Sequence, residues 1–282
     1  MVKKIAILLT VHNRKEKTLS CLNNIFSQIK MDDTSLKVFL TDDGCTDGTV
    51  EDVIKRFPDV IIINGDGNLF WNRGMFEAWK VAEKTDEFDY ILWLNDDTRL
   101  MNDSLYRLIA CSHSVDNKSV IVGSTLESED NPTFSYGGKT SGIKQRPLFP
   151  DDNKIKDCVT FNGNIVLIPN FVFKRCGIID GHFHHSFGDV EYGFRTTKFG
   201  IKNYVAPGYY GYCKHNNPIP IFRRKCNSIV KRYKLLYSPL GYNPFEAFYM
   251  NRKYFSLLSS LWFSIKLHIN VLFPIDHTKY EN

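Results

Sequence analysis

The sequence predicts an α/β protein: a doubly wound, mostly parallel sheet, a mixed second half and a C-terminal helical tail. Three observations support this. Short apolar runs alternate with amphipathic segments through residues 5–123, and such alternation is typical of βαβ units. The pattern then becomes polar and irregular up to residue 160. Residues 222–282 are basic and aromatic.

The first half predicts strands and helices in strict alternation. Each predicted strand is an apolar run bounded by turn residues: residues 5–11, 37–40, 60–63, 90–94 and 120–123. The predicted helices cover residues 19–29, 49–57, 75–82 and 104–114. The first helix places Leu19, Leu22 and Ile25 on one face, and Pro58 ends the second.

The second half predicts loops and short strands over residues 124–160. Further strands are expected at 162–168 and 205–213, and helices at 172–176 and 190–199. We therefore expect one domain over residues 1–221, with halves 1–123 and 124–221, followed by a separate helical region over 222–282.

Charge and cysteine content exclude several classes of protein. The net charge of +5 comes from the tail, because residues 1–221 hold 26 Lys and Arg against 28 Asp and Glu, and residues 222–282 hold ten against three. A nucleic-acid-binding protein would carry this charge on its recognition domain. Seven cysteines without C-x-x-C spacing disfavour a disulfide framework or a zinc knuckle and indicate a reducing compartment. The first apolar run is too short for a signal peptide and precedes His12-Asn13-Arg14 instead of a cleavage site.

The tail predicts a peripheral membrane contact through residues 222–273. Basic residues fill 222–234, and 245–273 is rich in leucine and aromatics, a composition that suits the lipid headgroup zone. Lys266 and His268 interrupt the apolar run before it reaches the roughly 20 residues of a membrane span. The alternative is a C-terminal helix packed on the domain.

A pair of adjacent carboxylates follows the predicted strand 90–94. Asn95-Asp96-Asp97 lies where open α/β sheets bind ligands. Paired carboxylates beside an amide suit a hard divalent cation that phosphate oxygens also bind. The alternative is that these residues cap the next helix.

Three other turns follow strands of the first half. The first is Thr10-Val11-His12-Asn13-Arg14. The second, 41–49, carries Asp42 and Asp43, whose carboxylates can accept hydrogen bonds from a pyrimidine imide or a ribose. The third, 65–74, is glycine-rich and carries Trp71 and Arg73, which can stack on or pair with base and phosphate. It is not a P-loop, because no G-K-[ST] follows.

The order and spacing of these turns resemble the family 2 glycosyltransferases, which have the GT-A fold. The matching stretches are Thr10–Arg14, Asp42–Thr49, Asn68–Gly74 and Asn95–Asp97, then Phe161–Asn164, Gly177–Asp180 and Phe187–Arg195. The variant found here is most similar to rhamnosyltransferase-type bacterial members. The resemblance makes 1–123 the nucleotide-sugar half and 124–221 the acceptor half.

The resemblance implies an inverting transfer from a nucleotide-diphosphate sugar, dTDP- or UDP-linked. Asp97, with Asp96 beside it, would hold Mg²⁺ or Mn²⁺ on the diphosphate, and His215 matches the position of a further metal ligand in some members. Asp43 or Asp42 would read the base. The candidate nucleotide-binding residues are Thr10, His12, Arg14, Asp42, Asp43, Asn68, Trp71, Arg73 and Asp96.

Asp189 occupies the place of the family's catalytic base. The family commonly has Glu-Asp there, whereas this chain has Gly188-Asp189. Glu191 is the alternative base, or pairs with Arg195 at i+4, and a helix N-cap is the structural alternative for Asp189. The candidate acceptor-binding residues are Asn162, Asn164, His184, His185 and Glu191.

These features predict a metal-dependent glycosyltransferase that builds a bacterial surface polysaccharide on a glycan or lipid-linked acceptor. We expect it in the cytoplasm, peripheral on the cytoplasmic face of the inner membrane. One alternative is a nucleotidyltransferase, but the first turn, Thr10–Arg14, lacks the glycines usual there. The other is a non-catalytic partner in glycan assembly.

Overall fold

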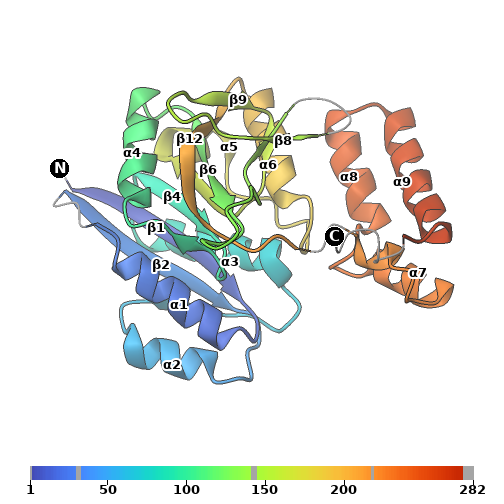
Figure 1. Cartoon of the computed structure of the whole chain (residues 1–282), viewed down its shortest axis with the longest axis horizontal. Coiled ribbons are helices and arrows are strands. Elements are labelled where there is room, and N and C mark those ends of the chain that lie inside the picture. The colour runs from blue at the N-terminus through green and yellow to red at the C-terminus, as the bar shows by residue number, and fades with distance from the viewer. Residues whose placement is uncertain (1, 30–32, 141–144, 217–218, 276–282) are drawn as a thin grey trace.

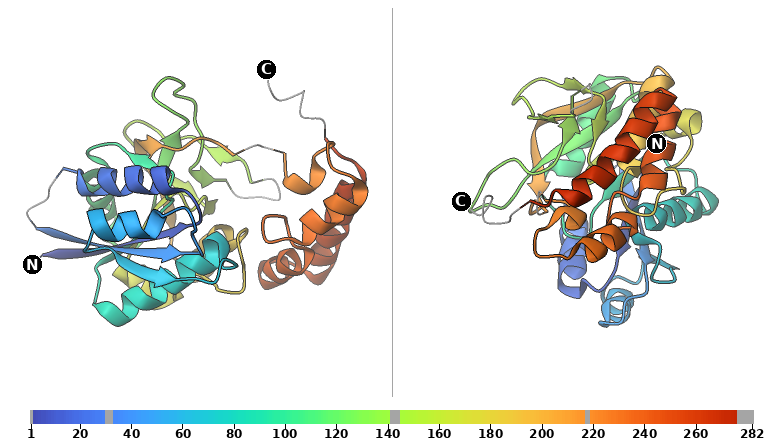
Figure 2. Two further views of the ribbon diagram at one scale, coloured as in Figure 1. Left: turned by 90° about the horizontal axis from the view of Figure 1, so that it is seen from below. Right: turned by 90° about the vertical axis from the view of Figure 1, so that its right-hand side faces the viewer.

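The computed structural model describes residues 2–29, 33–140, 145–216 and 219–275. At its centre is a large sheet with helices against both faces (Figures 1 and 2). Its strands are β1 (Lys3–Val11), β2 (Thr34–Asp42), β3 (Ile61–Asn64), β4 (Tyr90–Leu94), β5 (Arg99–Leu100), β6 (Val120–Leu126), β9 (Lys156–Cys158), β11 (Ile165–Pro169) and β12 (Asn203–Tyr212). They follow the order β3-β2-β1-β4-β11-β6-β12-β5, with β9 beside β12.

The directions of the strands confirm the predicted fold class and indicate the edge of the sheet at which a ligand would bind. β1 runs parallel to both β2 and β4, and β2 runs parallel to β3. The chain therefore leaves β1 on one side and returns on the other at β4, and the crevice at the carboxyl ends of such a pair is where α/β sheets bind ligands. β11 is antiparallel to β4, with Ile165 opposite Leu94. Its start, just after Asn164, therefore meets the end of β4.

The sheet separates two apolar cores. One face is covered by α1 (Lys15–Phe26), α2 (Thr49–Arg56) and α4 (Ser104–Ser114), and the other by α3 (Phe70–Thr85), α5 (Asn170–Cys176) and α6 (Gly188–Lys198). In β1, Ile5 and Ile7 point to the first core, and Ala6 and Leu8 to the second. Because successive side chains alternate between two covered faces, the strand is apolar throughout.

Several predicted boundaries are wrong. α1 covers Lys15–Phe26 instead of 19–29, and β11 begins at Ile165 instead of residue 162. α3 begins at Phe70 instead of Met75, so the second half of the predicted glycine-rich loop is helical. β5 has two residues, too few for an apolar run to reveal it.

The C-terminal part contains three helices, α7 (Ile229–Tyr237), α8 (Pro244–Tyr254) and α9 (Leu257–Leu272), after a short 3₁₀ helix, η1 (Ile221–Arg223). Their shared core consists of Phe222, Leu236, Ala247, Leu267 and Val271. Figure 1 shows them grouped beside the sheet. Among the described residues, no helix combines the length and the apolarity that a membrane span needs. The last predicted tail residues, 276–282, lie outside the described residues.

A second, three-stranded sheet, in the order β10 (Thr160–Phe161), β7 (Gly138–Lys139) and β8 (Pro147–Leu148), completes the predicted irregular region.

Candidate active site

A large cavity opens at the carboxyl ends of β1 and β4. Its volume is about 1130 Å³, and it extends from the turns after these strands to the start of α6 and to α8 and α9. It brings together many of the predicted residues. The predicted residues that line it are Thr10, His12, Arg14, Asp43, Trp71, Asp96, Asp97, Asn162, Asn164, His185 and Asp189.

Arg14 joins the two carboxylates of the turn after β4. Its Nη1 donates to Asp96 Oδ1 at 3.0 Å and to Asp97 Oδ2 at 3.1 Å. Asp96 is buried, whereas the Asp97 side chain is 20% exposed. Burial raises the pKa of Asp96 to about 6 against the opposing effect of Arg14. Asp97 is therefore the more exposed of the two carboxylates that line the cavity.

Trp71 ties this turn to the acceptor half. Its Nε1–H donates to Asn95 Oδ1 at 2.9 Å, and its ring lies against Gly163, where a Cβ would come within 2.4 Å of the indole. Thr10 donates to the Trp71 carbonyl at 3.4 Å. The first turn, the start of α3 and the turn before β11 thus form one continuous wall of the cavity.

Asp43 fixes the start of α3. Its two carboxylate oxygens accept the backbone N–H groups of Leu69 and Phe70 at 3.1 and 2.8 Å, which starts the helix earlier than the local sequence predicts. Asp43 still lines the cavity, and each carboxylate oxygen keeps a lone pair for a ligand. Asp42 does not line it; its Oδ1 accepts the Cys45 N–H at 2.8 Å.

Asp189 lies in the first turn of α6, after an N-cap at Phe187. Its Oδ2 accepts the Gly163 N–H at 3.1 Å, and its Oδ1 accepts the Val190 N–H at 2.8 Å. His185, beside it in the cavity, has its pKa lowered by burial, although the charge of Asp189 opposes this. Asp97 and Asp189 thus line the same cavity, one from each half of the chain.

The residue before Asp189 has no room for a side chain. A Cβ at Gly188 would lie 1.6 Å from Asn72 Oδ1. Asn72 is buried, and its Nδ2 donates to the carbonyls of Asp180 and Phe183 at 2.8 Å. The buried Asn72 of α3 therefore leaves room only for glycine at position 188.

Other predicted residues do not line the cavity. Arg73 belongs to α3 and donates to the Gly181 carbonyl at 3.3 Å. The backbone N–H of Asn68 bonds to Asp66. His184 contacts Glu246 of α8. The exposed His215 stacks on Tyr136 with its Nδ1 2.6 Å from the Asn216 carbonyl.

Glu191 is the clearest correction to the acceptor-binding set. Its side chain is fully buried, and Arg195 Nη2 donates to it at 2.6 Å, so the alternative pairing at i+4 is the one observed. A carboxylate in this position does not reach an acceptor in the cavity.

The carboxylates of Asp96 and Asp97 suit a cation that is bound by the protein and by a substrate phosphate together. In the described part of the chain, no three His, Cys, Asp or Glu side chains are grouped to hold a metal ion. Mg²⁺ does not require such a group, because it commonly binds one or two carboxylates together with substrate phosphates. Asp97 and Asp96 supply carboxylates of this kind at the cavity.

The sequence interpretation missed an entire wall of the cavity. Residues of the C-terminal helices and their connections line it, with aromatics and one cation among them: Leu240, Tyr242, Met250, Asn251, Phe255, Ser259, Trp262, Phe263 and Lys266. No motif marks them. Their signal in the sequence is the density of aromatic residues from 242 to 263, which the sequence analysis interprets as a membrane contact and not as part of the cavity.

Residues 6–183 match the model of glycosyl transferase family 2. The chain belongs to this family. The resemblance that its turns indicate is thus confirmed at the level of the family.

Two crystal structures of S. aureus TarS have a similar fold. One matches with a TM-score of 0.53 and 13% identity, over 98% of this chain and 44% of that one. The other, TarS 1-349, matches with a TM-score of 0.53 and 12% identity, over 95% and 70%. At these identities the likeness concerns the fold alone, and the chain spans less than half of the first structure's length. No curated protein matches the chain.

Proposed function

We propose that this glycosyltransferase moves a sugar, with inversion, from a nucleotide-diphosphate donor to an acceptor hydroxyl. The observation that supports the proposal is the single cavity that Asp97 and Asp189 share. A displacement of this kind needs charge neutralisation at the leaving group and a base at the attacking hydroxyl. The two aspartates, one from each half of the chain, suit those two tasks.

The donor half is the wall made by the turns after β1 and β4. Arg14 offers a guanidinium to the diphosphate, and His12, Thr10 and Trp71 surround the nucleotide, for which we propose dTDP or UDP. Asp97, with Asp96 beside it, would hold Mg²⁺ or Mn²⁺ here; when bound, the cation stabilises negative charge on the leaving diphosphate. The sugar that we propose first is rhamnose, from the similarity of the motifs to the rhamnosyltransferase-type members.

The acceptor half is the wall around Asp189. Its carboxylate takes the proton of the acceptor hydroxyl while that oxygen forms a bond to the anomeric carbon. The bond from this carbon to the diphosphate oxygen breaks, and the nucleoside diphosphate leaves. Asn162, Asn164 and His185 line the cavity beside this position and orient the acceptor.

We place the reaction in bacterial surface glycan synthesis, on a glycan or lipid-linked acceptor at the cytoplasmic face of the inner membrane. The support is the surplus of seven positive charges in residues 222–282, ten Lys and Arg against three Asp and Glu. Positive charge next to aromatic and aliphatic residues favours an anionic lipid surface.

The test is a nucleotide-release screen of the purified protein with Mn²⁺ and a panel of dTDP- and UDP-sugars. Release of the nucleoside diphosphate from one donor is the expected result. Formation of pyrophosphate from a nucleoside triphosphate and a sugar phosphate would instead identify a nucleotidyltransferase. Binding without any turnover, with acceptor glycans present, would point to a non-catalytic partner in assembly.

A further inference from the structure

The outer face of α9 is apolar and uncovered in the described structure. At 100° per residue its exposed apolar side chains fall within an arc of about 140°: Leu257, Leu258, Leu261, Trp262, Ile265, Ile269 and Leu272. The opposite face, with Ser260, Leu267 and Val271, is buried. In the right-hand view of Figure 2, α9 crosses the front of the tail.

The charge of the tail surface complements an anionic partner. Among the described residues from 222 to 275, Glu246 is the only acid, and it is buried against His184. Lys231 and Lys234 of α7 and Lys266 of α9 are exposed. A protein partner of ordinary composition would gain little from this one-sided charge, whereas a bilayer with anionic headgroups offers both an apolar interior and negative charge.

The apolar face adjoins the cavity. Ser259, Trp262, Phe263 and Lys266 line the cavity, and they follow the apolar arc around the helix. Trp262 belongs to both surfaces. A bilayer seated on this face would therefore lie next to the acceptor wall.

We propose that the α9 face (257–272) binds an anionic lipid bilayer and presents the cavity to a membrane-held acceptor. The part of this proposal that concerns the acceptor rests on the proposed function. The binding of α9 to the bilayer does not. Full-length protein should float with phosphatidylcholine–phosphatidylglycerol vesicles, and less with pure phosphatidylcholine or at high salt. Ile265→Glu should reduce the bound fraction by about tenfold, because it puts a charge into the apolar contact.

A matched control is Ile54→Glu on α2, since Ile54 is 56% exposed and Ile265 51%. No flotation, or equal effects of the two variants, would overturn the proposal. So would a dimer in sedimentation velocity that Ile265→Glu dissociates, because the face would then bind a second copy. Nucleotide release without vesicles reports on the transferase function separately: release with no flotation rejects the membrane face alone, and flotation with no release rejects the transferase alone.

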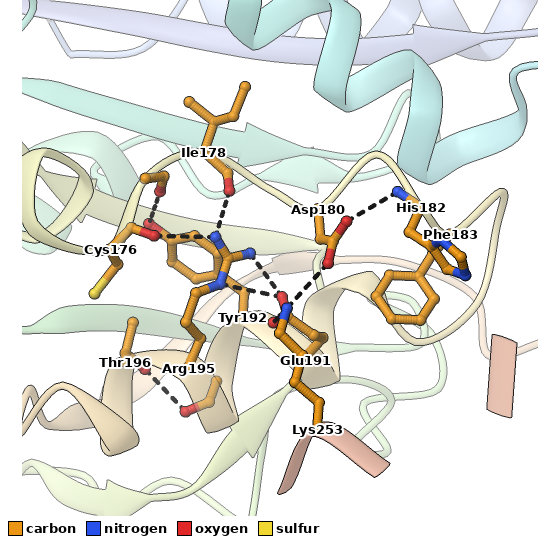
Figure 3. A network of polar contacts seen from close by, with 12 residues as sticks. Cys176, Ile178, Asp180, His182, Phe183, Glu191, Tyr192, Arg195, Thr196 and Lys253 are labelled. Atoms are coloured by element: carbon orange, nitrogen blue, oxygen red, sulfur yellow. Dashed lines mark hydrogen bonds and ion pairs between the residues drawn. The ribbon is translucent and has the colours of Figure 1, made fainter. Parts of the chain in front are cut away.

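A second, independent observation concerns a partly buried network that joins α8 to α6 and to the loop before α6. Lys253 Nζ lies 2.7 Å from Glu191 Oε1 and 3.0 Å from Asp180 Oδ2 (Figure 3). Burial alone would lower the pKa of Lys253, but the hydrogen bonds and charges of the two carboxylates raise it. The ammonium group of Lys253 therefore stays charged. It joins two carboxylates, Asp180 and Glu191, that are eleven positions apart in the sequence.

Those two carboxylates bracket the segment that carries the proposed base. Residues 180–191 include His185 and Asp189, which line the cavity. Two further contacts from α8 reach this segment: Tyr249 donates to Asp180 at 3.1 Å, and Tyr254 donates to Glu191 at 2.5 Å. Figure 3 shows Lys253 pointing up from the tail to meet both acids.

We infer that Lys253 is a positioning residue that holds segment 180–191, and with it Asp189, in place for turnover. Glu191 keeps Arg195 and Tyr254 as partners without it, so Lys253→Met should still fold. Turnover in nucleotide release should fall by about tenfold or more, because small displacements of a reacting group are costly. The affinity for UDP or dTDP, measured by calorimetry, should not change, and Lys253→Arg should restore much of the turnover.

The matched control is Arg252→Met, which removes the neighbouring exposed cation of the same helix. Equal turnover in the Lys253→Met and Arg252→Met variants would overturn the inference. A parallel loss of nucleotide affinity and turnover would also overturn it, since that pattern indicates a general loss of structure. If the wild-type chain itself releases no nucleotide, the proposed function fails, whatever the variants do.

Discussion

The guanidinium of Arg14 donates to Asp97 at 3.1 Å, across 83 residues of sequence. The contact brings a positive charge to the carboxylate that we assign to the cation, at the same edge of the cavity. In the proposed function, the diphosphate of the donor would meet Arg14, and its phosphate oxygens would replace the two carboxylates as partners of the guanidinium. We therefore expect donor binding to break the ion pair between Arg14 and Asp97.

Asp97→Ala should abolish nucleotide release and weaken nucleotide-diphosphate binding in the presence of Mn²⁺, because it removes the more exposed carboxylate of the pair. We expect at least about a hundredfold loss of turnover, as for other single transition-state contacts. Asp59→Ala, at an exposed position before β3, is the control. Wild-type release from Asp97→Ala would refute the assignment.

Asp189→Asn should leave donor binding intact and remove turnover. The amide has nearly the same shape and its oxygen can still accept the Gly163 N–H, but it cannot take a proton at neutral pH. Calorimetry with the nucleotide and a release assay separate the two effects. Loss of nucleotide binding instead would assign Asp189 to the donor or to the fold.

Asp96 should make folding stability depend on pH. Its pKa rises from 3.8 to about 6 through burial, so between these values the folded chain binds the proton more tightly than the unfolded chain. Its contribution to stability therefore falls as pH rises through this range, by up to about 3 kcal/mol. The difference in unfolding free energy between Asp96→Asn and wild type should grow in favour of the variant from pH 4.5 to 7.5 in urea titrations. A difference in unfolding free energy that stays constant with pH would show that burial does not shift the pKa of Asp96.

Gly188→Ala should destabilise the chain by about 2 kcal/mol, because its methyl group would overlap Asn72. Asn72→Ala alone should also destabilise it, by removing the donor to the Asp180 and Phe183 carbonyls. The double variant should lose less than the sum of the two, since each change removes part of the other's cost. Urea unfolding measures all three, and simple additivity would contradict the overlap.

Much of the fold could be predicted because its signals are local. Strand 90–94 and helix 104–114 are predicted at their observed bounds, since an apolar run and an amphipathic period are properties of neighbouring residues. The turn after β1 and the turn after β4 also lie close together as expected, with Arg14 bonded to Asp97, because parallel strands end at one edge of a sheet.

The errors come from contacts that are distant in sequence. Asp43 bonds to the first N–H groups of α3 from more than twenty residues away, so the Gly- and Asn-rich stretch before Met75 reads locally as loop. His184 and Glu191 resemble site residues until α8 supplies Glu246 and Lys253 as partners. The division of the chain at residue 221 stays a prediction, although the tail forms part of the cavity wall.

The overlap between positions 188 and 72 also constrains how the sequence of this chain can change. A variant that gains a side chain at position 188 is unstable unless Asn72 has already been replaced by a smaller residue. Positions 72 and 188 are far apart in the gene, but a change at one depends on the residue at the other. Because the amide of Asn72 fills the space, a smaller residue at position 72 has to come before a larger one at position 188.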